Sequence, residues 1–184
     1  MMDARARADG FTLVELLVVL SLIAILASLA FPVYQRVVQS GRATGCVSNL
    51  RQLSVGLGAY LADNNNVMPT LNIARSSTAV NVPVIDNTLS KYITVKGVFA
   101  CPADTNGFAQ STGTSYFWNV ALNGQSLANL NFLQNLLGNQ NTQLPSRIPV
   151  MADKEGFHPY LSNKVNVLYA DGHATQDLTF FTGN

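Results

Sequence analysis

The first strong pattern along the chain is an uninterrupted apolar run over residues 11–31. Glu15 is the only charged residue in this run, and Thr12, Ser21 and Ser28 are its only other polar residues. About 20 apolar residues in a helix, rising about 1.5 Å per residue, match the hydrocarbon thickness of a bilayer. The pattern therefore predicts a membrane-spanning helix with a single carboxylate near its start.

The residues that precede the run predict its orientation. Arg5 and Arg7 lie before it, and no comparable basic cluster follows closely. The positive-inside rule then keeps the N-terminus in the cytoplasm and sends the chain beyond about residue 35 across the membrane. The run exceeds the apolar region of a secretory signal peptide, about 7–15 residues, and the small residue Gly10 precedes it instead of following it. An uncleaved signal anchor is the simpler alternative, but it gives Glu15 no role.

A second pattern, with helical spacing, follows the membrane segment. Between residues 46 and 61 the apolar residues recur at intervals of three and four, which predicts one apolar stripe on an extracytoplasmic helix. Pro32 should kink or loosen the helix between the two patterns, and the polar residues 63–66 should end it. We favour packing against a core over a partner groove for this stripe, which comprises Cys46, Leu50, Leu53, Leu57, Tyr60 and Leu61.

The chain beyond residue 63 is typical of a small mixed domain. Residues 92–102 and 114–122 are rich in β-branched or aromatic side chains and predict strands, whereas residues 126–138 predict a short helix. Val165, Val167 and Tyr169 recur at every second position before Asp171-Gly172, which predicts a C-terminal β-hairpin. Together these elements predict an α+β fold, in which a long N-terminal helix packs on a small C-terminal antiparallel β-sheet.

Composition limits the functional classes. Apolar residues make up 48% of the 184 residues, charged residues only 11%, and the net charge is +1. The charged fraction is less than half of the roughly 25% usual for soluble proteins, and nothing provides the basic surface that nucleic acid requires. Nucleic acid is therefore not an expected partner.

The chain has two cysteines, Cys46 and Cys101, and the sequence leaves two alternatives for them. In an oxidising compartment beyond the membrane they could form a disulfide that joins the helical stripe to the end of the predicted strand at residues 99–102. They could equally be two buried free thiols, because Cys46 lies in the apolar stripe and cysteine is commonly buried.

The position of Glu15 suggests a cleavage event. It lies four residues after Phe11, one helical turn, so a cut between Gly10 and Phe11 would place a new α-amino group close to this acid. The stretch "GFTLVELLVVLSLIAILASLAFP", residues 10–32, resembles the N-terminal class III signal of type IV pilins and type II secretion pseudopilins. The resemblance implies that a prepilin peptidase cleaves after Gly10 and methylates Phe11, and that Glu15 meets the N-terminal amine of a neighbouring subunit during assembly.

The same resemblance implies a domain organisation and a location. Residues 1–10 would be the leader peptide, 11–34 the transmembrane and filament-core helix, 35–62 its extracytoplasmic amphipathic half, and 63–184 a globular α+β head domain. The chain would cross the inner membrane once, with the head in the periplasm or, after assembly, at the cell surface. Its implied partners are further pilin copies, prepilin peptidase, an assembly ATPase, an inner-membrane platform protein and, before assembly, membrane lipid.

Several C-terminal phrases carry a second resemblance. "CVSNLRQL", "NNNVMPT", "FACPAD", "SYFWN" and "NVLYADGHA" are similar to phrases in pseudopilin-like proteins of planctomycetes and verrucomicrobia. These phrases are scattered through most of the chain beyond the membrane segment. They extend the expected pseudopilin-like character to the head domain.

The residues with potential chemistry are few. Asp153, Asp171 and His173, with His158 and Glu155, could gather into a metal site, and the resemblance to pseudopilins makes calcium the candidate cation. The alternative is that Asp171-Gly172 is an ordinary hairpin turn and that the histidines are bystanders. No Gly-x-Ser-x-Gly motif is present and two histidines make no evident triad, so no enzyme is expected.

Two functional classes follow. The favoured one is a structural subunit of a type IV pilus-like or type II secretion filament, and the alternative is an extracytoplasmic binding or enzymatic domain on a pilin-type anchor. The sequence leaves open which kind of filament is formed and whether the subunit is major or minor.

Overall fold

We analysed a computed structural model, which describes residues 12–126, 145–158 and 165–176. The chain divides into two compact units, Met1–Val38 and Gln39–Asn184. One long helix, α1 (Leu13–Asp63), contributes residues to both units.

The first unit contains the apolar part of α1. Every side chain from residue 12 to residue 37 is exposed, and the most apolar window has a mean hydropathy of 2.7. The hydroxyls of Ser21 and Ser28 donate to the carbonyls of Val18 and Ile25, each at 2.7 Å, so neither needs water. The predicted helix of membrane-spanning length and composition is confirmed. Pro32 lies inside α1, which is helical on both sides of it, and the kink there stays a prediction.

In the second unit, the C-terminal part of α1 presents the predicted stripe to a core. Five of the six stripe residues are buried, and Tyr60 is partly buried and packs against them. The interpretation of this stripe as core is therefore confirmed. The helix ends at Asp63, as predicted, because Asn65 and Asn66 adopt left-handed backbone angles (φ 54° and 57°) that break the helical path. The N–H of Asn66 donates to the Leu61 carbonyl at 2.8 Å and closes the end of the helix.

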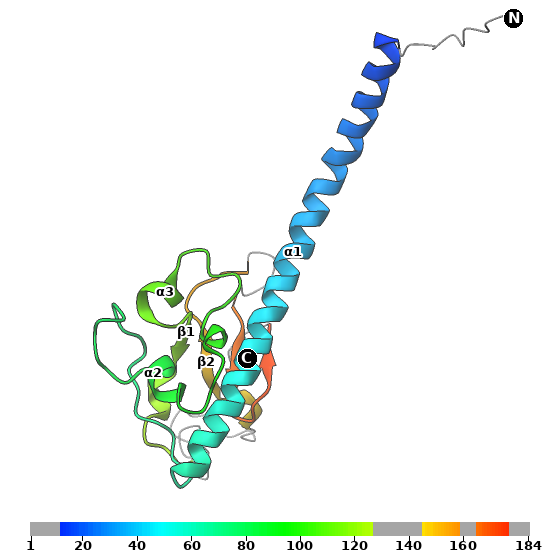
Figure 1. The fold of residues 1–184 in the computed structure, drawn as a ribbon. Coiled ribbons are helices and arrows are strands. Elements are labelled where there is room, and N and C mark those ends of the chain that lie inside the picture. The colour runs from blue at the N-terminus through cyan, green and yellow to red at the C-terminus, as the bar shows by residue number, and fades with distance from the viewer. Residues whose placement is uncertain (1–11, 127–144, 159–164, 177–184) are drawn as a thin grey trace, which may run out of the picture. The chain divides into compact units, whose positions relative to one another are not determined.

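The sheet of the second unit is a four-stranded antiparallel meander in the order β1-β2-β3-β4 (Figure 1). Trp118 on the first strand faces Met151, and Met151 faces Leu168. All three side chains belong to the buried core. The predicted α+β fold is confirmed. The strands are β1 (Tyr116–Trp118), β2 (Pro149–Asp153), β3 (Val167–Tyr169) and β4 (Ala174–Thr175).

Some of the predicted strands are present, and one of them is shorter than predicted. The C-terminal hairpin is confirmed: β3 pairs with β4, and Gly172 supplies the left-handed position of the turn (φ 88°). Residues 114–122 form a strand only over β1, which is followed by a short 3-10 helix, η2 (Val120–Leu122). The expected helix at residues 126–138 lies, beyond Ser126, outside the described residues.

The strand expected at residues 92–102 is wrong. This segment instead contains a 3-10 helix, η1 (Lys96–Phe99). Its apolar side chains Ile93, Val98 and Phe99 are buried in the core. They hold an irregular segment against the core, although the backbone of this segment does not pair with the sheet. The described residues of this unit also form three short helices: α2 (Ile85–Leu89), α3 (Phe108–Thr112) and η4 (Pro145–Arg147).

Two glycines of α1 offer a test of this packing. A Cβ at Gly56 would lie 2.5 Å from side-chain carbons of Ile93, whereas a Cβ at Gly58 would meet nothing within 4 Å. We expect Gly56→Ala to lower the free energy of unfolding by about 1–2 kcal/mol, because overpacking outweighs the gain in helix propensity. Gly58→Ala, the matched control, should raise it by up to about 1 kcal/mol. Denaturant titration of the full chain in detergent micelles measures both, and equal effects would contradict the close approach at Gly56.

Candidate functional site

The start of α1 is closed by a reciprocal pair of side chains. The backbone N–H and the hydroxyl of Thr12 donate to Glu15 Oε2 at 2.9 and 2.8 Å, and the N–H of Glu15 reaches Thr12 Oγ1 at 3.2 Å. This arrangement is a capping box, which satisfies backbone groups that a helix start otherwise leaves without partners. In the separate chain, Glu15 therefore has local partners and lies where the helix dipole favours an anion.

Thr12 is a residue that sequence reasoning missed. The signal was present, since Thr12-Leu-Val-Glu15 has the T-x-x-E spacing of a capping box. The predicted processing positions, Gly10 and Phe11, lie outside the described residues. The contact between Glu15 and the terminus of a neighbouring subunit stays a prediction.

The surface beyond this cap is apolar on all sides. Between residues 13 and 37 the large apolar side chains are between 46% and 78% exposed, and a helix that is apolar all round requires an apolar environment. Lipid meets that requirement, and so would the apolar helices of other chains.

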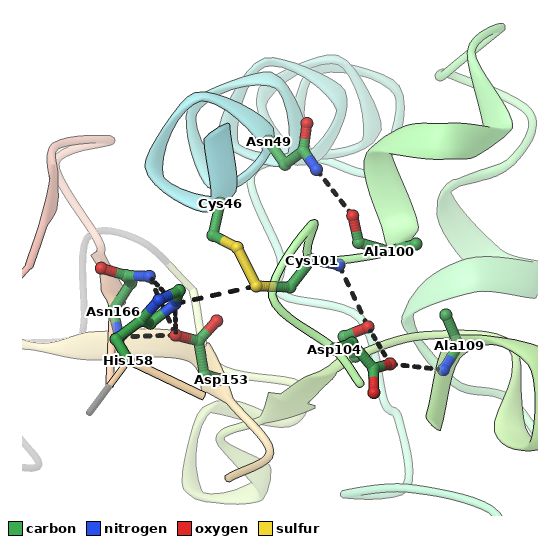
Figure 2. The surroundings of a disulfide bond; sticks show 10 residues. Cys46, Asn49, Ala100, Cys101, Asp104, Ala109, Asp153, His158 and Asn166 are labelled. Carbon is green, nitrogen blue, oxygen red and sulfur yellow. Dashed lines mark hydrogen bonds and ion pairs between the residues drawn. A yellow bond between two sulfur atoms is a disulfide. The ribbon is translucent and has the colours of Figure 1, made fainter. Parts of the chain in front are cut away.

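In the second unit, Cys46 and Cys101 are joined by a disulfide that links α1 to the segment after η1 (Figure 2). The bonded pair has a Cα–Cα distance of 4.8 Å and a sequence separation of 55. A hydrogen bond of 2.8 Å from Asn49 Nδ2 to the Ala100 carbonyl runs beside it. Both sulfur-bearing residues are buried. Of the two alternatives left open by the sequence, the structure contains the bridge.

A second polar feature lies on the other side of Cys101. The carboxylate of Asp104 accepts hydrogen bonds from the Ser115 hydroxyl at 2.7 Å and from the Phe108 and Ala109 N–H groups at 3.1 and 2.9 Å. Burial acts to raise the pKa of Asp104, but these hydrogen bonds to the charged form outweigh burial and lower it. Asp104 thus holds α3 beside the disulfide as an ionised cap.

A buried polar cluster lies beneath the disulfide, formed by Asp153, His158 and Asn166 (Figure 2). Asp153 Oδ2 accepts from the backbone N–H and the side-chain amide of Asn166 at 2.7 and 2.9 Å, and lies 3.2 Å from His158 Nε2. The same imidazole nitrogen lies 3.7 Å from Cys101 Sγ. Burial raises the pKa of the Asp153 carboxyl above its usual value, although the hydrogen bonds from His158 and Asn166 oppose this shift.

This cluster is not fully satisfied. Asp153 Oδ1, His158 Nδ1 and Asn166 Oδ1 are buried without a hydrogen-bond partner in the described part of the chain. Burial, with the negative charge of Asp153 next in effect, raises the pKa of the Tyr116 phenol far above its usual range. Unsatisfied buried polar groups are rare in folded proteins, so the cluster requires a specific explanation.

The remaining metal-site candidates lie elsewhere. Asp171 and His173 form a pair at the hairpin turn, with 2.5 Å between Asp171 Oδ1 and His173 Nδ1, and the His173 ring stacks on Tyr169 at 4.5 Å. Burial acts to raise the pKa of Asp171, but the bonds from His173 outweigh it and lower the pKa. Glu155 accepts from Asn106 at 2.6 Å.

The structure thus brings Asp153 to His158 and Asp171 to His173, as two separate pairs. Among the described residues, three potential metal-ligating side chains do gather in one place: those of Cys46, Cys101 and His158. Calcium binding at the predicted residues Asp153, Asp171 and His173 stays a prediction.

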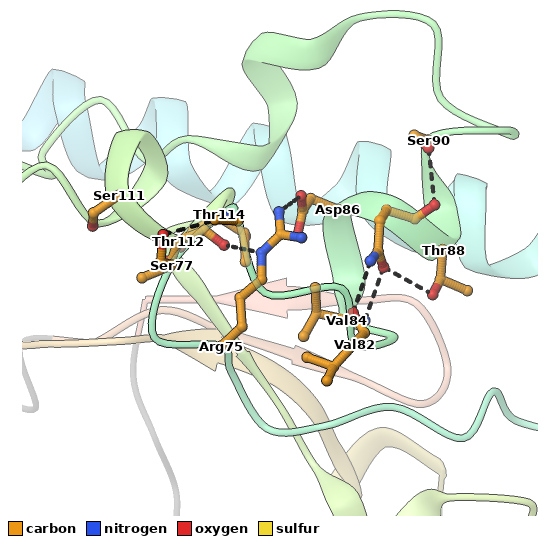
Figure 3. Close-up of polar contacts among 12 residues, drawn as sticks. Arg75, Ser77, Val82, Val84, Asp86, Thr88, Ser90, Ser111, Thr112 and Thr114 are labelled. Atoms are coloured by element: carbon orange, nitrogen blue, oxygen red, sulfur yellow. Dashed lines mark hydrogen bonds and ion pairs between the residues drawn. The ribbon is translucent and has the colours of Figure 1, made fainter.

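One more polar cluster, away from these sites, is structural. Arg75 forms an ion pair with Asp86 at 2.5 Å and donates through Nε to the Thr112 carbonyl at 2.8 Å (Figure 3). A side chain at Gly113 would overlap this ion pair, and its φ of 92° also favours glycine. The cluster ties α2 and α3 to the loop that follows α1.

Comparison with known families identifies the N-terminal segment. Residues 5–31 match the family described as the prokaryotic N-terminal methylation motif. The chain therefore carries a type IV pilin-like prepilin signal, and its N-terminal part has the features of a prepilin peptidase substrate and of a membrane-anchored protein. Searches of curated proteins and of solved structures find no match. The resemblance of the C-terminal phrases to planctomycete and verrucomicrobial proteins stays a prediction.

Proposed function

We propose, from the prepilin-type methylation motif at residues 5–31, that this chain is a structural subunit of a type IV pilus-like or type II secretion filament. A prepilin peptidase would cleave it after Gly10 and methylate the new amine of Phe11. The observation that carries the proposal is the combination of this motif with an apolar helical segment, residues 13–37, whose side chains are all exposed. Such a helix suits a subunit that exchanges a lipid environment for the helices of other subunits.

The role of Glu15 in assembly follows from its position in the capping box. In the separate chain, Oε2 takes both hydrogen bonds from Thr12, so the charge of the carboxylate is satisfied by neutral donors only. A protonated amine on a neighbouring Phe11 would add an ion pair, in which the donor and the acceptor are both charged. Because a carboxylate in lipid has few competing cations, this contact would fix the axial position of each added subunit.

The location and partners follow from the same signal. Before assembly the apolar helix would lie in the inner membrane with its N-terminus in the cytoplasm, and the second unit would lie outside. An assembly ATPase and a platform protein would extract the subunit, and packing between the apolar helices would replace lipid contacts. This structural role assigns no enzymatic activity to the chain.

Three variants test the proposal. Glu15→Leu removes the charge and the cap, Glu15→Gln keeps an acceptor for the cap but removes the charge, and Thr12→Ala weakens the cap but keeps the charge. We expect both Glu15 variants to insert into the membrane and be cleaved normally but to yield at least about tenfold fewer filaments, because the amine contact contributes more than about 1.4 kcal/mol. Thr12→Ala should assemble near the normal level.

Membrane fractionation, N-terminal sequencing and filament counts by electron microscopy give these three readouts. Normal filament yield from Glu15→Gln and Glu15→Leu would contradict the assembly role. It would favour the alternative, a binding or enzymatic domain that uses a pilin-type segment only as an anchor. A mature protein that still begins at Met1 would contradict the processing step.

A further inference from the structure

The disulfide and the buried polar cluster together form a set of potential metal ligands. Cys46 Sγ, Cys101 Sγ and His158 Nε2 all lie within 4.8 Å of one another, and all three residues are buried. They come from α1, from the segment after η1 and from the segment after β2, so the fold brings them together from distant parts of the sequence. Two sulfurs and one imidazole are the ligand types of structural zinc sites.

Asp153 lies next to the imidazole and offers an oxygen as a fourth ligand. Asp153 Oδ2 lies 3.2 Å from His158 Nε2, and the side-chain amide of Asn166 lies within 2.9 Å of both atoms. The same imidazole nitrogen therefore contacts Asn166, Asp153 and the sulfur of Cys101. A carboxylate oxygen and a sulfur thus lie beside one imidazole nitrogen, which is an arrangement that a cation would stabilise.

We propose that reduction of the Cys46–Cys101 disulfide converts this cluster into a Zn²⁺ site, with Cys46, Cys101 and His158 as ligands and Asp153 as the fourth. A dithiol would supply two electrons and two protons and become a disulfide itself, leaving two protein thiols. Zn²⁺ would then displace both thiol protons to solvent and bind the two thiolates. The ligand types favour zinc over calcium, because soft thiolate and imidazole ligands suit Zn²⁺, whereas Ca²⁺ requires oxygen ligands.

The geometry needs little rearrangement. With Zn–S of about 2.3 Å and Zn–N of about 2.0 Å, a tetrahedral site places ligand atoms about 3.5–3.8 Å apart. Cys101 Sγ and His158 Nε2 are already 3.7 Å apart. The two sulfurs must separate by about 2 Å from a bonded distance of about 2.0 Å, which side-chain rotation can provide. The closed, buried character of the cluster suits a structural site and not a catalytic one, which would keep an open position.

As a consequence, α1 would stay linked to the segment after η1 in both redox states. Under oxidising conditions the link is the disulfide, and under reducing conditions with zinc present it is the metal. The proposal does not depend on the filament role, since it concerns residues of the second unit alone.

The test uses the full chain in detergent micelles, oxidised or treated with a phosphine reductant, and then supplied with Zn²⁺ or with Co²⁺ as a spectroscopic substitute. We expect the reduced chain to bind one Zn²⁺ per molecule, to show a thiolate-to-cobalt charge-transfer band, and to unfold at a higher temperature with zinc than with a chelator. The oxidised chain should bind none at this site.

Two histidine variants make the site assignment falsifiable. His158→Ala should weaken zinc binding to the reduced chain by at least about 100-fold, more than the loss of an outer-shell partner of a ligand. His173→Ala, the matched control at the hairpin turn, should bind as the wild type does. The proposal is overturned if the reduced wild type binds no zinc, if zinc does not stabilise it, or if the His158→Ala variant binds as tightly as the wild type.

Discussion

Replacing both Cys46 and Cys101 by serine should lower the free energy of unfolding of the second unit by about 4 kcal/mol, measured with a chelator present. The disulfide closes a loop with a sequence separation of 55, and on the chain-entropy model a bridge over a loop of this size stabilises by roughly 4 kcal/mol. For a unit of this size the change corresponds to a melting temperature lower by roughly 10–20 °C. Thermal unfolding followed by circular dichroism in detergent micelles measures it.

Chemical reduction of the wild type provides the comparison. Because it opens the same loop without changing the sequence, the reduced wild type with a chelator should melt near the double variant. The oxidised double variant should in turn be insensitive to the reductant. If the double variant is as stable as the oxidised wild type, closing the loop between Cys46 and Cys101 does not destabilise the unfolded chain. That result would contradict the expected entropic contribution of the disulfide.

Truncating the buried acid should have an effect of similar size. We expect Asp153→Ala to lower the free energy of unfolding by about 3 kcal/mol, because it leaves two donors of Asn166 and the imidazole of His158 buried without their acceptor. Asp153→Asn keeps an oxygen that can accept from Asn166 and should cost less. Denaturant titration of the oxidised chain at neutral pH compares the two variants with the wild type.

The pH dependence separates the charge of Asp153 from its hydrogen bonds. Burial raises the pKa of its carboxyl above the model-compound value of 3.8, so the folded state holds this proton at a pH where the unfolded chain has released it. The binding of this proton therefore stabilises the folded state. Its contribution to the free energy of unfolding is complete below pH 3.8 and is lost as pH rises through the folded-state pKa, with a slope of at most about 1.4 kcal/mol per pH unit.

Asp153→Asn cannot release this proton, so its stability relative to the wild type should rise across the same interval. Parallel pH profiles for the two proteins would contradict a raised pKa at Asp153. The Asp171→Asn variant, which changes an acid whose pKa is lowered, should show the opposite sign, with stability relative to the wild type that falls as pH rises above the folded-state pKa of Asp171.

The parts of the fold that could be predicted are those in which local spacing determines burial. The apolar run predicts a helix exposed on all sides, and the three- and four-residue spacing from Cys46 to Leu61 predicts a helix buried on one side, as the structure shows. Asp171-Gly172 predicts a turn because few other residue pairs accept its backbone angles, and Gly172 adopts φ 88°.

The predictions that failed depend on partners distant in sequence. The segment containing Ile93, Val98 and Phe99 has the composition of a strand, but its side chains fill the core against α1 instead of pairing in the sheet. β-branched and aromatic residues indicate burial at least as strongly as they indicate strand structure. Local signals cannot distinguish these outcomes.

The candidate site shows the same division. The Thr12–Glu15 cap is local and could have been found from its T-x-x-E spacing. The cluster of Cys101, Asp153, His158 and Asn166 comes from three separate segments, and no spacing in the sequence relates them. Only the folded arrangement places the imidazole of His158 beside a sulfur atom.

The position of the disulfide has a mechanical consequence. Any tension applied to α1 from its N-terminal end travels along the helix and meets the first buried residues at Ala43 and Cys46. At Cys46 the load passes through a covalent bond into the segment after η1 before it reaches Leu50, Leu53 and the rest of the stripe. The disulfide thereby reduces the shear force on the non-covalent contacts between α1 and the core. Under such tension, α1 would stay attached to the second unit through a covalent bond.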